Sequence, residues 1–206
     1  MKKVFFLFLL SAFFVEMSAQ ETRLGITAGV NISSPSELNS KAGFHAGVKA
    51  EHAFADRLYA SLGLLLTSKG WKTATYYDIA EQRTFQSEAT PYYLEMPVHV
   101  GYKVAVGRGV KVFADAGPYL GLGLFGSFKQ VSTMNAVTTE VVCDNLFKEK
   151  KQKRFDWGLG LNAGVELAGR YQVSVGYDQG LTKMFKKDMR QDSKNGVFKL
   201  SLAYLF

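Results

Sequence analysis

Three side chains suited to proton transfer or ligand binding, Glu95, His99 and Lys103, are spaced four residues apart. In an extended strand every second residue shares a face, so all three would project from the same side. A carboxylate, an imidazole and an amine on one face could form a proton-linked gate or a ligand site. They could also pair with opposite charges across a narrow interior, because a buried unpaired charge is costly. We favour this structural interpretation.

Other acidic and basic residues follow the same spacing in similar segments. In each strand they would lie on one face, and Arg23, Lys111 and Lys199 would lie on the same face of theirs. This polar face is therefore close to charge-balanced. A balanced set of charges can be buried when its members pair with one another. We therefore predict an interior polar network with a structural role, made of Lys49, Glu51, Glu95, His99, Lys103, Asp115, Asp156, Glu166 and Asp178.

Enzymatic chemistry has less support. Serine hydrolysis needs a histidine beside a serine, with an acid that orients the imidazole. None of the three histidines, His45, His52 and His99, has a serine two residues away, although a cross-strand pair such as His99 with Ser61 stays open. No clustered ligand spacing indicates a metal, and Cys143 is the only cysteine, so no disulfide forms within the chain. We expect no catalytic residue, cofactor or metal.

The first 19 residues have the features of a cleaved signal peptide. Two lysines precede an apolar run over residues 4–15, and the small Ala19 stands before Gln20. A transmembrane helix would need about 20 apolar residues. Because the segment holds two lysines and one glutamate, its removal lowers the formal net charge from +7 to +6. We expect a signal peptide at 1–19 and one β-barrel domain at 20–206, in an exported protein that does not bind nucleic acid.

Eight segments of the remaining chain alternate with the period of two that is typical of β-strands. One phase of each segment is almost wholly apolar and contains no Asp, Glu, Lys or Arg. The other phase holds the charged residues and most of the 20 glycines. We predict antiparallel strands at 22–32, 43–54, 57–67, 92–104, 110–124, 155–167, 171–178 and 197–206.

This alternation fits a soluble barrel with the apolar phase inside, or a membrane barrel with that phase facing lipid. The glycines suit a crowded, charged interior better than a solvated exterior. Aromatic residues also gather at strand ends, as in the interfacial girdles of membrane barrels, at Phe54, Tyr102, Tyr171, Tyr204 and Phe206 and at Phe44, Tyr92, Phe155 and Trp157. We predict an all-β, eight-stranded, antiparallel, up-and-down transmembrane β-barrel in the bacterial outer membrane.

The connections between the predicted strands alternate in length. Short ones follow the second, fourth and sixth strands, and long ones lie near 33–42, 68–91, 125–154 and 179–196. This is the layout of outer-membrane barrels, which have short periplasmic turns and long extracellular loops. Pro97 and Pro118 lie inside predicted strands, where proline cannot donate a ladder hydrogen bond. We expect bulges there, or strands that end sooner.

Two long loops are strongly basic. Residues 148–154 read KEKKQKR, and the last loop adds Lys183, Lys186, Lys187, Arg190 and Lys194. Contact with lipopolysaccharide phosphates or an acidic partner is one interpretation, and a solvated loop is the other. The second loop could form an adhesive surface with its aromatic residues Tyr76, Tyr77, Phe85, Tyr92 and Tyr93, although girdling also accounts for the last two.

The chain stops at the end of an alternating strand, with Tyr204 and Phe206 in its apolar phase. The barrel-assembly machinery would take such a strand by edge pairing before the sheet closes. We expect Tyr204 and Phe206 to form an assembly signal. The expected partners are this machinery, outer-membrane lipid and lipopolysaccharide.

Four short runs resemble the PorT-like outer-membrane β-barrel family: Ser18-Ala19-Gln20, Leu94-Glu95-Met96-Pro97, Ala116-Gly117-Pro118-Tyr119 and Phe155-Asp156-Trp157-Gly158. The resemblance covers most of the chain after residue 19 and includes both prolines. It implies the barrel fold and, because the founding type belongs to a protein-secretion system, secretion-system proteins as partners. We expect a non-catalytic protein with a structural, adhesive or assembly role. The alternatives are a transport barrel for small or hydrophobic molecules and, third, a lipid-modifying enzyme.

Overall fold

The structure, a computed structural model, describes residues 22–36, 38–79, 83–134, 137–143, 146–147, 152–185 and 193–206. The predicted signal peptide at 1–19 lies outside the described residues. Within those ranges, no helix has the length and apolar character needed to cross a membrane. The described strands join in one antiparallel sheet.

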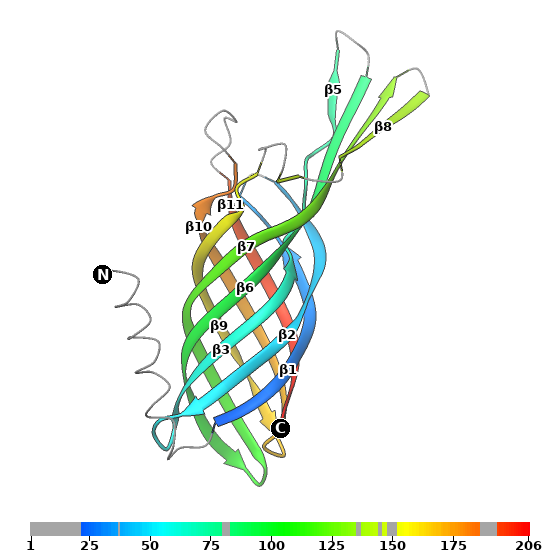
Figure 1. The fold of residues 1–206 in the computed structure, drawn as a ribbon. Helices are drawn as coiled ribbons and strands as arrows, with labels where there is room; N and C mark the ends of the chain where they lie inside the picture. The colour runs from blue at the N-terminus through cyan, green and yellow to red at the C-terminus, as the bar shows by residue number, and fades with distance from the viewer. Residues whose placement is uncertain are drawn as a thin grey trace, which may run out of the picture.

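Eight strands of the described chain pair in a closed ring (Figure 1). Each is antiparallel to both neighbours, and β1 pairs with β11 to close the ring. Closure leaves no unpaired edge, which a bilayer could not hydrogen-bond. This confirms the predicted eight-stranded barrel, whose strands are β1 (Thr22–Ser33), β2 (Asn39–Ala53), β3 (Leu58–Ser68), β6 (Arg83–Gly107), β7 (Val110–Met134), β9 (Phe155–Leu167), β10 (Tyr171–Lys183) and β11 (Lys194–Leu205).

The two ends of the ring differ in their connections. At one end only a few residues join β2 to β3, β6 to β7 and β9 to β10, and Phe206 lies there too; we call this the short-turn end. The opposite end is the long-loop end. A small apolar cluster packs there between the loops and β4 (Trp71–Lys72), and consists of Trp71, Ala89, Leu146, Met184 and Phe185.

A four-stranded sheet projects beyond the ring at the long-loop end (Figure 1). The strand β5 (Tyr76–Asp78) pairs with the first residues of β6, and β8 (Val137–Cys143) pairs with the last residues of β7. The ends of β6 and β7 also pair with each other in this region. We call this sheet the blade; it comprises residues 76–78, 83–89, 128–134 and 137–143.

The blade corrects two of the predicted connections, because much of 68–91 and 125–154 is strand. β6 starts at Arg83 rather than near residue 92, and β7 runs to Met134 rather than residue 124. The prediction was wrong because it took apolar alternation facing lipid as the sign of a strand. Beyond the membrane, strands need only pair their backbones, and both segments carry residues that favour strands, such as Phe85 and Val131.

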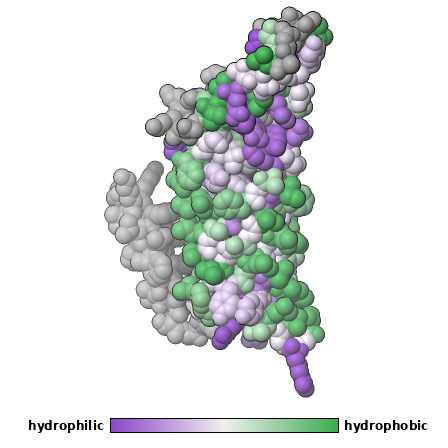
Figure 2. Space-filling model, turned by 90° about the vertical axis from the view of Figure 1, so that its right-hand side faces the viewer, coloured by the Kyte–Doolittle hydropathy of each residue, from purple (hydrophilic) through white to green (hydrophobic). Residues whose placement is uncertain are grey.

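The two phases of the ring strands face opposite ways. Apolar side chains of the outer phase are exposed on the barrel wall, among them Ile26 (53 %), Leu62 (48 %) and Leu161 (56 %). Figure 2 shows hydrophobic side chains over the wall on the face in view, with hydrophilic ones near the base of the blade and at the opposite end. Most charged residues of the other phase are buried in the lumen. This is the polarity of a barrel that stands in lipid.

Pro97 and Pro118 lie inside ring strands without a bulge, so that expectation was wrong. The β6–β7 register is the same on both sides of Pro97, and the β7–β9 register is unbroken at Pro118. Gly63, on the strand beside Pro97, leaves room for the proline ring, since a Cβ there would lie 2.9 Å from Pro97 Cγ. The register shifts instead between Tyr92 and Tyr93, next to the blade.

Candidate functional site

The charged side chains of the lumen form three layers along the barrel, of which the first lies near the short-turn end. In this short-turn layer Glu51 and Glu166 are buried and both face Arg23 and Lys103. Arg23 lies 2.8 Å from Glu51 and 3.0 Å from Glu166, and Lys103 lies 2.8 and 2.6 Å from the same two carboxylates. The Gln172 amide donates to both at 2.9 Å. Every buried negative charge in the layer therefore has a cationic partner.

A second group, the long-loop layer, crosses the lumen near the other end. The ammonium group of Lys69 is fully buried and lies 2.6 Å from Glu95 and 3.0 Å from Asp156. Lys199 lies 2.6 Å from Glu95 and also pairs with Asp178. Lys69 Nζ is 4.2 Å from the centre of the Tyr119 ring, a cation–π contact. Two lysines and three carboxylates thus form one buried cluster.

The middle layer is built around Asp115. His99 Nδ1 lies 2.7 Å from Asp115 Oδ1, and the Tyr59 hydroxyl donates to Asp115 Oδ2 at 2.7 Å. The Asn162 amide donates to the same carboxylate at 2.9 Å. Three groups from three strands orient this carboxylate, so the imidazole beside it is held in a fixed position.

The layers separate the three residues of the predicted gate. Glu95 lies in the long-loop layer, His99 in the middle layer and Lys103 in the short-turn layer. A strand rises about 3.3 Å per residue, so residues four apart are about 13 Å apart. Their shared face therefore does not make them a single site, and each finds its partners on other strands.

Each of the other predicted network residues also lies in one of these layers. Lys49 joins the short-turn layer, where its ammonium group lies 3.0 Å from Glu51 and donates to Gln172 at 2.9 Å. Asp156 and Asp178 lie in the long-loop layer.

Several partners in the layers were missing from the predicted set, above all Lys69. This residue falls in a segment predicted as a loop, yet it continues the inward phase of β3 by one more step of two. Extending the alternation past Ser68 would have found it. Arg23 and Lys199 were already assigned to the polar phase, but their partners depend on how the ring closes.

A second imidazole in the lumen, that of His45, is hydrogen-bonded to neutral side chains. His45 is almost fully buried, with Nδ1 2.7 Å from Asn31 Oδ1 and Nε2 2.9 Å from the Ser201 hydroxyl. Serine hydrolysis was weighed for His99 with Ser61, which lie opposite each other on β6 and β3. The hydrogen bonds of His99 instead go to Asp115 and Asn162.

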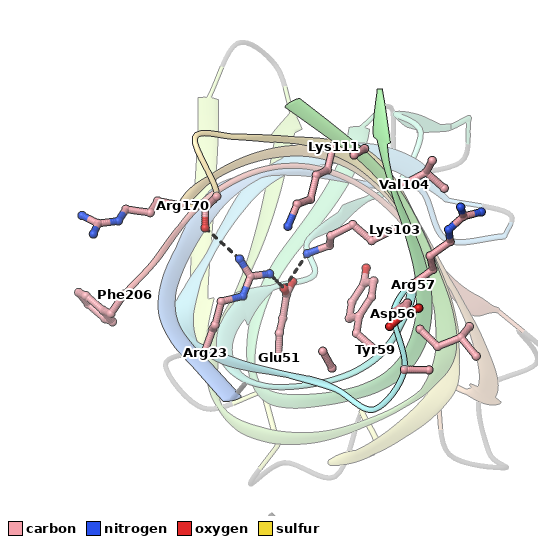
Figure 3. A pocket seen from close by; sticks show the side chains of 15 residues that line it. Arg23, Glu51, Asp56, Arg57, Tyr59, Lys103, Val104, Lys111, Arg170 and Phe206 are labelled. Atoms are coloured by element: carbon pink, nitrogen blue, oxygen red, sulfur yellow. Dashed lines mark hydrogen bonds and ion pairs between the residues drawn. The ribbon is translucent and has the colours of Figure 1, made fainter. Parts of the chain in front are cut away.

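A cavity of about 620 Å³ opens at the short-turn end (Figure 3). Arg23, Lys103 and Lys111 point into it beside Glu51, whereas Arg170 and Phe206 point away from the lumen. We call it the mouth cavity. A second cavity of about 80 Å³ lies deeper in the lumen and is lined by residues that include His45, Lys49, Gln172, Ser174 and Ser201. We call it the inner cavity.

The two residues of the predicted assembly signal lie at the short-turn end. The Tyr204 ring stands 5.2 Å from that of Tyr171 and 5.4 Å from that of Phe206, measured between ring centres. Phe206 is 70 % exposed, and its backbone N–H donates to the Leu24 carbonyl at 2.7 Å. These aromatic rings lie at one rim, where a girdle was predicted.

The blade carries exposed apolar side chains, including Tyr76 (64 %), Ile79 (82 %) and Val137 (68 %) at or beside its strands. Tyr93 was considered as part of an adhesive surface or of an aromatic girdle. It is instead buried in the lumen, with 1 % exposure, and Lys69 lies over its ring. Much of the predicted basic surface, residues 148–151, 186, 187 and 190, lies outside the described residues.

Metal binding has no support within the described part of the chain, where no three His, Cys, Asp or Glu side chains are grouped suitably for an ion. Cys143 is the last residue of β8.

A family model described as outer membrane protein beta-barrel domain matches residues 17–186. The chain belongs to this family. Its members are proteins of the bacterial outer membrane, and the predicted localisation is confirmed. The resemblance to an outer-membrane β-barrel family is thereby confirmed at this level, and the narrower PorT-like assignment stays a prediction. No curated protein matches the chain.

Solved structures of small outer-membrane barrels are similar to the chain. Neisserial surface protein A is 16 % identical, with 90 % of this chain and 97 % of that chain covered and a TM-score of 0.43. Ail, the attachment invasion locus protein of Yersinia pestis, solved with the heparin analogue sucrose octasulfate, is 14 % identical, with 90 % and 99 % covered and a TM-score of 0.40. The outer membrane enzyme PagL is 14 % identical, with 88 % and 98 % covered and a TM-score of 0.41.

Proposed function

We propose that this barrel is a structural and adhesive component of the outer membrane that holds the blade outside the cell, where the blade binds a partner protein. The observation that carries the proposal is the blade itself. It extends β6 and β7 beyond the ring and adds a strand on each side, although closing the barrel needs neither. The chain thus builds ordered sheet where the membrane does not require it.

The edges of the blade suit a partner that offers an extended strand. Within the described residues, β5 pairs only with β6 and β8 pairs only with β7. Each therefore has a row of backbone groups that a further strand could hydrogen-bond, as in β-strand addition. Exposed Val137 and Val141 on β8 would supply apolar contacts for alternate side chains of the partner.

The lumen favours an anchor over a transport barrel. The short-turn and long-loop layers both cross it, and each holds buried carboxylates paired with lysine or arginine. A solute would have to separate several of these pairs, which is costly because the charges lose their partners in a buried site. Eight-stranded barrels are just filled by their own side chains.

Orientation and partners follow the outer-membrane layout. Short turns are periplasmic in such barrels, so the blade would be extracellular and the mouth cavity periplasmic. The PorT-like resemblance makes a secretion-system protein a candidate partner for the blade. Lipopolysaccharide phosphates would meet the basic loops, and the barrel-assembly machinery would read Tyr204 and Phe206.

Photo-crosslinking in intact cells tests the blade. A photoreactive amino acid is placed at Val141 on β8 or, as a control, at lipid-facing Leu161 on the barrel wall. We expect position 141 to yield one discrete protein adduct, identified by mass spectrometry, and position 161 to yield none. The adduct should disappear when Val137, on the same strand, is changed to lysine. Absence of a discrete adduct at position 141 would contradict the proposal.

A further inference from the structure

One rung of the barrel brings a serine and a histidine together across a glycine. Gly29 on β1 is paired with Ser201 on β11 and with His45 on β2. A Cβ at position 29 would collide with the His45 ring, so the glycine leaves the space that the imidazole needs to reach Ser201. The Ser201 hydroxyl lies 2.9 Å from His45 Nε2, although the two residues are 156 positions apart in sequence.

The hydrogen bonds of Asn31 determine the tautomer of His45. The Asn31 amide nitrogen donates to the Phe44 carbonyl at 3.0 Å, to Thr67 Oγ1 at 2.8 Å and to the Ser68 carbonyl at 3.2 Å. Because the Phe44 and Ser68 carbonyls can only accept, they fix the amide so that its oxygen faces His45 Nδ1 at 2.7 Å. An amide oxygen only accepts, so Nδ1 carries a proton.

In the neutral imidazole Nε2 is then the acceptor, and the Ser201 hydroxyl donates to it. Serine, histidine and orienting amide therefore stand in the relation that activates a serine nucleophile, with the base beside the hydroxyl and a third group holding the base. A histidine with only a structural role could be hydrogen-bonded by any polar neighbours and would not need a hydroxyl on one ring nitrogen and an orienting amide on the other. Here each of the three side chains comes from a different strand.

We infer that Ser201 is an activated nucleophile, with His45 as its base and Asn31 as the residue that orients the base, and that it accepts acyl groups of acetyl size from small esters. The size limit comes from the inner cavity, which Ser201 and His45 line. Its volume of about 80 Å³ holds about five water molecules, so only a short acyl group fits beside the hydroxyl. Ser201 is partly exposed to this space.

The reaction is an acyl transfer through Ser201. Its Oγ attacks the carbonyl carbon of the ester while the hydroxyl proton passes to His45 Nε2. The bond from that carbon to the alcohol oxygen breaks, and the alcohol leaves with the proton. Water then attacks the acyl-serine, His45 takes a proton from the water and returns it to Oγ, and the acid is released.

Access to the inner cavity runs past Lys49. Lys49 and Gln172 line the inner cavity, and both contact Glu51, which lines the mouth cavity. These two side chains therefore form part of the partition between the cavities, together with Tyr59, which lines the mouth cavity and donates to Asp115 of the inner cavity. Lys49 Nζ donates to Gln172 Oε1 at 2.9 Å, and rotation of this one side chain would remove part of the partition.

Methanesulfonyl fluoride, a small reagent that sulfonylates activated serines, tests the inference on the refolded full-length barrel. The serine oxygen bonds to sulfur, the S–F bond breaks, and hydrogen fluoride leaves. We expect peptide mass spectrometry to find modification at Ser201, slowed at least a hundredfold in His45→Gln because the base is lost. Lys49→Ala removes one side chain of the partition and should speed the modification.

Ser174 is the matched control because it is paired with Ser201 across β10 and β11 and lines the same cavity. We expect no modification of Ser174, and Ser174→Ala should leave the rate at Ser201 unchanged. Gel mobility before and after heating checks that each variant is a closed barrel. Modification only in Lys49→Ala would still support the nucleophile and assign Lys49 as the barrier. Equal modification of Ser174, or none of Ser201 in either wild type or Lys49→Ala, would overturn the inference.

Discussion

The short-turn layer and the long-loop layer use the same residue types but differ in their access to water. In the long-loop layer Lys69 and Glu95 are fully buried, and Lys199 is nearly so. The short-turn layer borders the mouth cavity, and its Arg23 side chain keeps 19 % exposure. A similar ion-pair network can therefore act as a sealed plug at one end and as the wall of a water-filled mouth at the other.

The difference shows which charges the fold depends on. A buried charge that loses its partner keeps the full cost of its burial, whereas water can replace a partner beside an open cavity. Stability should therefore be more sensitive to changes in the long-loop layer. Three charge variants test this comparison and a terminal deletion adds a variant outside both layers; they follow from the largest expected loss of stability to the smallest.

Lys69→Ala should be the most damaging. It leaves Asp156 without its lysine and Glu95 with Lys199 alone, in a site closed to water. We expect a loss of about 3–5 kcal/mol in the free energy of unfolding, measured by urea titration of the barrel in detergent. Lys72→Ala, an exposed neighbour 3.5 Å from Glu88, is the control and should cost less than about 1 kcal/mol. Equal losses would contradict a plug at the long-loop end.

Arg23→Ala should have an intermediate effect. Lys103 and Gln172 still bind Glu51 and Glu166 in this variant, and water from the mouth cavity can reach the vacated place. We expect a loss of about 1–3 kcal/mol in the same titration. A loss as large as that of Lys69→Ala would mean that the two layers are equally closed, and the comparison would fail.

Deletion of Phe206 should separate stability from assembly. The ring is mostly exposed on the barrel wall, and the deletion removes one backbone hydrogen bond to Leu24. We expect a loss of about 1 kcal/mol for protein refolded in detergent. The amount inserted in cells, measured in outer-membrane fractions, should fall much further because the terminal strand is read during assembly. An equal proportional loss in both measurements would mean that Phe206 only packs.

Lys111→Ala should have the smallest effect. Its side chain is 45 % exposed, and its ammonium group lies 3.6 Å from Glu166, which keeps closer partners in Arg23 and Lys103. We expect less than about 1 kcal/mol in the urea titration, since exposed ion pairs contribute little. A larger loss would show that the short-turn layer is less hydrated than the mouth cavity implies.

Much of the fold could be predicted from local patterns. The alternation of Leu24, Ile26 and Ala28 with Arg23, Gly25 and Thr27 defines which side of β1 meets lipid, because side chains alternate faces along any strand. The same rule put the charged residues inside. It failed in the blade, where strands leave the membrane and no apolar face is required of them.

The sequence by itself therefore determined an eight-stranded barrel, its apolar exterior and the identity of most charges in its lumen. The tertiary structure alone decided which of those charges meet. Ring closure sets the register of β1 against both β2 and β11, and only that register brings Ser201 to His45 across Gly29. It likewise divides Glu95, His99 and Lys103 among three layers, because hydrogen-bond partners across a barrel depend on strand stagger rather than on spacing along one strand.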